Sequence, residues 1–200
     1  MPSQSDGRRR RSERSRQAIV QALFDVVGEG NLRATARDVA DRAGLDIRTV
    51  FRHFADMESL YVAMDERLQR EALPLLMAGD PSGTVPERAA SLVDQRATFF
   101  ERIAPYKRAG DLQRWRSPFL QAQHRALVRE LRAQLLRFFP ELEALDRELT
   151  ESLDLATSFE AWSRLRSEQR LGLVRARGVM ERMVLSLTKE LERRLRRRST

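Results

Sequence analysis

The clearest pattern of apolar and polar positions lies in the stretch TARDVADRAGLDIRTVFRHF, which begins at Thr35. Apolar residues recur there at helical spacing in two short runs that Gly44 separates. Thr35 and Asp46 stand just before the two runs, where a side-chain oxygen can accept an N–H of the first turn. The pattern therefore predicts helices over 36–43 and 47–54, joined at a glycine that enters the left-handed conformation at little cost.

The spacing within this stretch is typical of a helix-turn-helix. Ala40 is small enough for two helices to approach, Gly44 makes the turn, and Val50 fixes the second helix on the first. In such a unit the second helix lies in the major groove of DNA, with its N-terminal residues nearest the bases. The pattern alone leaves open an ordinary helical hairpin with solvated arginines.

Two longer helices are predicted on either side of this pair. Upstream, apolar residues four apart predict a helix over 13–27 that packs on the pair. Downstream, Asp56 can cap a helix that runs to about Met77, and Pro74 is expected to bend it near its end. The first of these helices completes a three-helix unit.

The remainder of the chain also predicts helices. A linker rich in glycine and proline, AGDPSGTVP, covers residues 78–86. Further helices are expected near 87–104, 106–115, 118–138, 142–167 and 173–196. The predicted fold class is all-α, with an N-terminal three-helix unit followed by a helical bundle, and about nine helices in total.

The net charge of +8 is concentrated at the two ends of the chain. Residues 8–16 carry +5 and residues 189–200 carry +4, whereas residues 17–188 sum to zero. The N-terminal arginines can contact phosphates or a minor groove, or they can form a solubilising tail. The C-terminal arginines suit the negative end of a helix dipole.

Composition argues against catalysis. The chain of 200 residues has no cysteine and two histidines, His53 and His124. We find no metal-ligand spacing, glycine-rich phosphate loop or nucleophile elbow, so no catalytic residue, metal or cofactor is predicted. No apolar run reaches the roughly 18 residues of a membrane span and no secretory signal is visible, so a cytoplasmic protein without a membrane partner is expected.

Residues 13–60 resemble the DNA-binding domain of the tetracycline-repressor-like (TetR) family. The segments RSRQAIVQALFDVVGEG, TARDVADRAGLDIRTVFRHF and ADMESLYVAM carry the resemblance, and TVFRHF is its most specific part. The arginine cluster predicts a flexible basic arm at 1–12. The resemblance implies a DNA-binding domain at 13–56 and a ligand-binding and dimerisation domain at 57–200. It also implies a one-component repressor that binds a palindromic operator as a homodimer and is released by a small-molecule effector.

The resemblance assigns DNA contacts position by position. Arg37 and Arg48 correspond to residues that reach base edges, where an arginine fork can bond guanine. Ile47 and Phe51 are expected to make apolar contacts, for example with a thymine methyl group. The expected phosphate contacts are Thr35, Thr49, Arg52 and His53.

Three positions depart from the family pattern. Arg48 stands where the family often has glycine, Phe51 replaces a usual tyrosine, and Met57 replaces a common lysine. These changes alter the expected affinity and operator sequence, and they leave the class of protein unchanged.

The last two predicted helices carry apolar stripes that suit pairing with a second copy, because family members pair through these helices as a four-helix bundle. A two-fold pair would also place two recognition helices on two half-sites. The alternative is that both stripes belong to the core of one chain. The expected interface residues are Leu153, Ala156, Met180, Val184, Leu187 and Leu191.

An effector pocket is expected among aromatic residues of the second half, although aromatic residues at helical spacing also pack as ordinary core. The candidate lining residues are Phe99, Phe100, Tyr106, Trp115, Phe119, His124, Phe159 and Trp162. The alternative function is an architectural or adaptor DNA-binding protein without an effector, which would show little sequence preference and a steep salt dependence.

Overall fold

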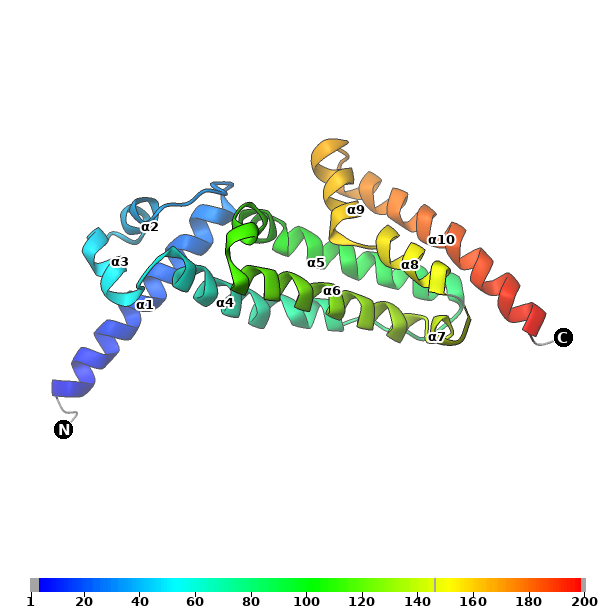
Figure 1. The fold of residues 1–200 in the computed structure, drawn as a ribbon, viewed down its shortest axis with the longest axis horizontal. Coiled ribbons are helices and arrows are strands. Elements are labelled where there is room, and N and C mark those ends of the chain that lie inside the picture. Colours follow the sequence, from blue (N-terminus) through cyan, green and yellow to red (C-terminus); the bar gives the residue numbers. More distant parts are fainter. Residues whose placement is uncertain (1–3, 146, 199–200) are drawn as a thin grey trace. The chain divides into compact units, whose positions relative to one another are not determined.

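The computed structural model describes residues 4–145 and 147–198, and these residues form helices and connecting turns without a strand (Figure 1). The predicted all-α fold class is confirmed. In chain order the elements are α1 (Gln4–Gly28), α2 (Ala36–Ala43), α3 (Ile47–His53), α4 (Met57–Met77), α5 (Val85–Gln113), the 3₁₀ turn η1 (Arg114–Arg116), α6 (Pro118–Phe138), α7 (Leu142–Leu145), α8 (Arg147–Ala156), α9 (Phe159–Ser163), the π-helical segment η2 (Arg164–Glu168) and α10 (Leu173–Arg198). No helix in the described ranges is long and apolar enough to cross a bilayer.

The chain divides into two compact units. Unit 1 comprises Met1–Glu71 and Ile103–Ala122, and unit 2 comprises Ala72–Arg102 and Gln123–Thr200. Helices α4, α5 and α6 therefore contribute residues to both units.

Unit 1 is built on one apolar cluster, which joins the predicted three-helix unit to the start of α4 and to part of α5. Its largest members are Ile19, Leu23, Phe24, Val27, Val39, Val50, Phe54, Leu60, Tyr61, Met64 and Tyr106. Phe24 and Tyr106 lie with ring centroids 4.1 Å apart. This cluster fixes the helix-turn-helix on a rigid base, since burial of each large apolar side chain stabilises by about 1.5–3 kcal/mol.

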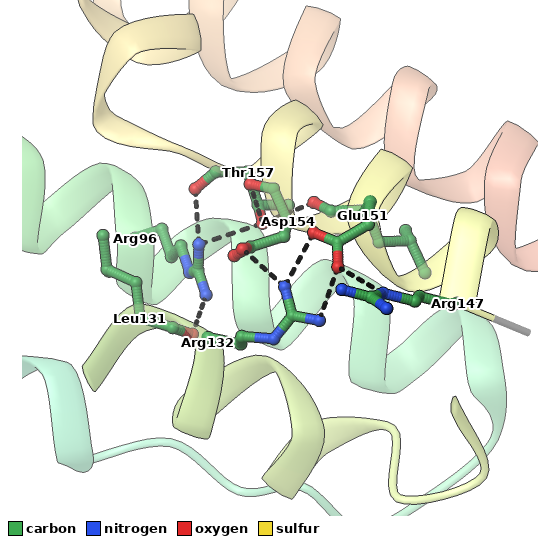
Figure 2. Close-up of polar contacts among 8 residues, drawn as sticks. Arg96, Leu131, Arg132, Arg147, Glu151, Asp154 and Thr157 are labelled. Carbon is green, nitrogen blue, oxygen red and sulfur yellow. Dashed lines mark hydrogen bonds and ion pairs between the residues drawn. The ribbon is translucent and has the colours of Figure 1, made fainter. Parts of the chain in front are cut away.

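Unit 2 has an apolar core with a cation at its centre. Helices α8 and α10 pack on each other, and Leu153 of α8 is buried, as are Met180, Val184 and Leu191 of α10. Arg96 of α5 is also buried, at 0 % exposed. Its guanidinium donates to the carbonyl oxygens of Leu131 and Thr157, as Figure 2 shows.

The predicted start of the first helix at Glu13 is wrong. Helix α1 begins at Gln4, so the described part of the 1–12 arm continues the helix. No proline interrupts residues 4–12, and arginine is a good helix former, so nothing in the local sequence ends the helix sooner.

The predicted division between helices over 87–104 and 106–115 is also wrong, because α5 continues through Pro105. Proline in a helix interior removes one backbone hydrogen bond and costs roughly 3 kcal/mol. Ile103 and Tyr106 beside it are buried. Burial of such neighbours offsets the cost of the proline.

The predicted single helix over 142–167 is divided into short segments. Ser158 caps α9, because its hydroxyl oxygen accepts the N–H of Ala161 at 3.1 Å. The carbonyl of Thr157 accepts a hydrogen bond from Arg96 at 2.6 Å. The helix therefore ends where a capping serine and a buried cation satisfy the backbone groups.

Candidate nucleic-acid interface

The first helix of the helix-turn-helix begins with a capping box. The hydroxyl oxygen of Thr35 accepts the Asp38 N–H at 3.2 Å, and the Asp38 carboxylate accepts the Thr35 N–H at 2.8 Å. These hydrogen bonds hold the pKa of Asp38 below its usual range. Reciprocal bonds of this kind satisfy two N–H groups that the helix leaves unpaired.

The turn between the two helices has the predicted geometry. Gly44 has φ +64° and its N–H donates to the carbonyls of Ala40 and Asp41. Asp46 then caps α3, because its carboxylate accepts the backbone N–H of Arg48 at 2.8 Å. The left-handed turn and the cap together set the direction in which α3 leaves α2.

Helix α3 buries one side and exposes the other. Val50 is buried in the core of unit 1, and Phe54 is buried at the C-cap. On the other side Arg48 and Arg52 are exposed, and Phe51 is 50 % exposed. A large exposed aromatic residue between two exposed arginines is unusual for a solvated face and suits a surface that another molecule covers.

The eight predicted contact residues differ in exposure. Arg37 and Arg48 are exposed and have no ion-pair partner within the described ranges, so their guanidinium groups are available for base edges. Ile47, Thr49 and His53 are half-buried along α3. The exposed members are Thr35, Arg37, Arg48, Phe51 and Arg52.

Thr35 has less freedom than the sequence suggests. Its hydroxyl accepts the Asp38 N–H, and the same hydroxyl donates to the Asp38 carboxylate at 2.8 Å. A phosphate contact by Thr35 would therefore have to replace a bond of the capping box.

His53 is in a partly desolvated position at the end of α3. Burial lowers its pKa, and the charges of Arg52 and Arg16 lower it further. Its Nε2 atom is buried and has no hydrogen-bond partner among the described residues. Burial and the two neighbouring cations therefore favour the neutral form of the imidazole.

Sequence reasoning missed two contacts that support the helix-turn-helix. The guanidinium of Arg16 lies 5.0 Å from the centre of the Phe54 ring, which ties α1 to the end of α3. Arg42 donates to Glu29 at 2.7 Å, which ties the end of α2 to the turn after α1. Sequence periodicity does not show long-range pairs of this kind.

The aromatic residues proposed for an effector pocket do not form one group. In unit 2, Phe100 packs edge-on against Phe159 at 5.6 Å and lies 6.5 Å from Trp162. Phe99 is buried beside them, with its ring 5.8 Å from that of Phe100. The Trp162 indole donates to Glu101 at 2.9 Å. These aromatic side chains pack against each other as core.

Other members of the predicted pocket are corrected. Trp115 is 77 % exposed on η1, so it does not line an internal pocket. Tyr106 belongs to the core of unit 1, where it packs on Phe24. Phe119 and His124 are half-buried on α6.

The predicted interface residues are also corrected in part. Leu153, Met180, Val184 and Leu191 are buried within the chain, so they have no exposed area for a second copy. Their stripes are the core side of α8 and α10, because helical periodicity identifies an apolar face but not what covers it. Ala156 and Leu187 are half-buried.

Helices α8 and α10 also carry large apolar side chains that are exposed, of which two are the most exposed. Leu155 of α8 is 69 % exposed and Val174 of α10 is 86 % exposed. Among the described residues no group of histidine, aspartate and glutamate side chains is arranged to hold a metal ion.

Two capped helices meet at a glycine turn, and the second helix exposes arginines while its other side is buried in an apolar core. This arrangement is that of a helix-turn-helix DNA-binding protein. Residues 19–64 match the family described as bacterial regulatory proteins, tetR family. Over these residues the chain is similar to the DNA-binding domain of this family of transcriptional regulators.

Solved structures share the fold across both units. A transcriptional regulator from Rhodococcus sp. RHA1 superposes with a TM-score of 0.69 at 19% identity, over 88% of this chain and 96% of that one. A TetR transcriptional regulator from the same organism gives 0.51 at 19% identity, over 88% and 98%. A complex of SmeT with triclosan gives 0.54 at 17% identity, over 86% and 90%. No curated protein sequence matches the chain significantly.

Proposed function

We propose that this TetR-family regulator is a repressor that binds a palindromic operator as a homodimer and releases it when a small-molecule effector binds. The observation that carries the proposal is the outer face of α3, where Arg48, Phe51 and Arg52 are exposed while Val50 anchors the helix. Residues 13–56 would read DNA, residues 57–200 would dimerise and bind the effector, and residues 1–12 would form a basic arm.

The roles on DNA follow from side-chain chemistry and exposure. Arg37 and Arg48 would bond base edges, since a guanidinium fork matches the two acceptors of guanine. Phe51 and Ile47 would pack on thymine methyl groups. The phosphate contacts would come from Thr35, Thr49, Arg52 and His53.

Two recognition helices are needed because one helix contacts too few base pairs for a specific site. The exposed side chains of Leu155 and Val174 support pairing through the outer surfaces of α8 and α10. Half-buried Ala156 and Leu187 lie on the same two helices and would gain burial at the rim of such an interface. A cytoplasmic location follows from this role.

The effector site would lie in unit 2, where α5 and α9 bring Phe100, Phe159 and Trp162 together. Since these rings are packed, a ligand would have to separate them, and a displacement of α5 would follow. Helix α5 contributes residues to both units, which gives such a displacement a covalent route to unit 1. Triclosan bound to a protein of similar fold supports an apolar effector.

The decisive experiment selects bound sequences from a random duplex library and reads the half-site spacing from the result. The proposal expects an inverted repeat with half-sites about one helical turn, or a multiple of it, apart. The alternative, an architectural protein with no effector, predicts no enriched sequence and affinity that depends on salt alone. Enrichment of a single, unrepeated site would contradict the dimeric mode.

A further inference from the structure

The first turns of α1 form a basic helix that packs on nothing in the described part of the chain. Residues 7–14 are exposed, and the first buried residue of the helix is Ile19. The stretch 7–14 carries five arginines and one glutamate. We refer to residues 7–14 as the arginine helix.

The arginine helix contains more like-charge neighbours than opposite-charge neighbours, because Glu13 is its one acidic residue against five arginines. Arg8 and Arg11 are three residues apart and Arg10 and Arg14 are four apart, so like charges are neighbours on the helix surface. Positive charge near a helix N-terminus also opposes the helix dipole. Glu13 accepts a hydrogen bond from Gln17 at 3.0 Å, and no ion pair joins it to an arginine in the described ranges.

The position of the arginine helix links it to the recognition helix. Two residues after it, the guanidinium of Arg16 lies over the ring of Phe54, the residue directly after α3. The charges of Arg16 and Glu13 both act on the pKa of His53, the last residue of α3. Figure 1 shows α1 continuing past α3 toward the N-terminus. The arginine helix therefore begins where the DNA-reading surface ends.

We propose that the arginine helix binds the phosphate backbone of the operator DNA beyond the half-site that α3 reads. Phosphates supply the negative charge that the arginine helix lacks, and their neutralisation releases counterions. The contact is to the backbone, so it adds affinity without adding base preference. This inference rests on the proposed function, because it requires α3 to be placed in the adjacent major groove.

The test compares salt dependence in variants of the full-length protein. Replacement of all four residues from Arg8 to Arg11 by glutamine should reduce the slope of log affinity against log salt by at least about 2, since each neutralised phosphate contributes about 0.9. Affinity should fall by the same factor on the selected operator and on random duplex. Replacement of the same four residues by lysine should leave the slope unchanged.

The matched control makes the same change of net charge elsewhere on the surface. It replaces four exposed arginines that form no ion pair within the described ranges by glutamine, namely Arg125, Arg129, Arg164 and Arg170. This control should retain the slope of the wild-type protein. An equal loss of slope in the control and in the glutamine variant of the arginine helix would show a general charge effect and overturn the inference.

Three other outcomes also overturn it. An unchanged slope in the glutamine variant excludes backbone contacts by the arginine helix. A slope lost equally in the lysine variant excludes a contact made by charge. A selective loss of flanking A·T preference would place the arginines in the minor groove instead. In each case the affinity of the wild-type protein for the operator and for random duplex is measured in parallel. If the wild-type protein does not prefer the operator, the proposed function itself is wrong.

Discussion

In unit 1 the arginines of the recognition helix lie at the surface, whereas unit 2 buries Arg88 and, completely, Arg96. Arg48 is exposed and without an ion-pair partner in the described ranges. Arg96 is 0 % exposed and donates to Gln134 at 3.0 Å and to the Thr157 hydroxyl at 2.9 Å, besides two carbonyl oxygens. The same type of side chain is therefore available for recognition in unit 1 and stabilises the packed core in unit 2.

The difference shows what a buried cation requires. Burial lowers the pKa of Arg96 to about 10, so it remains charged at neutral pH. It makes no direct ion pair in the described part of the chain, and its charge is solvated by oxygen atoms of α6 and of the residue after α8. The neighbouring Arg132 binds Glu151 and Asp154 instead (Figure 2). A buried charge is tolerated when hydrogen bonds replace its water.

The largest expected effect is the loss of stability when Arg96 is replaced. Arg96→Ala should lower the free energy of unfolding by about 3–5 kcal/mol, because it leaves buried acceptors unpaired and opens a cavity. Urea unfolding followed by circular dichroism measures this change. Arg147→Ala is the control on the same network, since its exposed side chain lies 3.8 Å from Glu151 and should contribute less than about 0.5 kcal/mol. If the two substitutions lowered the free energy of unfolding equally, the claim that buried Arg96 stabilises the core of unit 2 would be wrong.

The next largest effect is the loss of operator affinity when Arg48, the exposed counterpart of Arg96, is replaced. Arg48→Ala should weaken binding to the selected operator by about 1–3 kcal/mol and relax one base position, with little effect on unfolding. Binding titrations on the operator and on single-base variants measure both quantities. A loss of the same size on random duplex would assign Arg48 to the phosphate backbone.

Asp65 tests whether unit 1 contains a carboxylate whose charge is unfavourable because the side chain is partly buried. Burial raises the pKa of this carboxyl to about 6, a change that the hydrogen bond from Gln69 partly opposes. Because the pKa is raised on folding, protonation favours the folded state, and this contribution is complete below about pH 4 and lost as pH rises through about 6. Asp65→Asn should therefore stabilise the protein by about 1–2 kcal/mol at pH 7.5 and by nearly nothing at pH 4.

Unfolding measured at both pH values checks this prediction. The exposed neighbour Glu66 offers a control, because Glu66→Gln should change stability little at either pH. An Asp65→Asn variant that is destabilised at pH 7.5 would mean that the carboxylate is needed in its charged form.

The smallest expected effect is the change in DNA affinity when His53 is replaced. Its pKa lies below the ordinary value because of burial and of Arg52 and Arg16. A phosphate nearby would raise it, so affinity for any duplex should increase modestly as pH falls from about 7.5 to about 6. His53→Ala should weaken binding to all sequences alike, by about 0.5–1 kcal/mol, and should reduce this pH dependence. A pH profile that the substitution leaves unchanged would contradict the role.

Prediction from sequence succeeded for the helix-turn-helix because its signals are local. Thr35, Gly44 and Asp46 each act on backbone groups within a few residues, and the structure has each in the predicted role. Prediction was less accurate for unit 2. The break after Thr157 depends on Arg96, which lies far away in the sequence. A local indication was nevertheless present, since a serine with an acidic residue two positions later, here Ser158 and Glu160, is typical of a helix start.

The sequence by itself determined the helical class, the capped and glycine-pivoted pair of helices, and the outward position of the α3 arginines. These features depend on hydrogen bonds and steric limits within one or two turns of the chain. Only the tertiary structure decided that Leu153 and Met180 belong to the core and that Trp115 lies at the surface. Periodicity gives the direction of a side chain relative to its own helix, whereas burial depends on distant segments that pack against it.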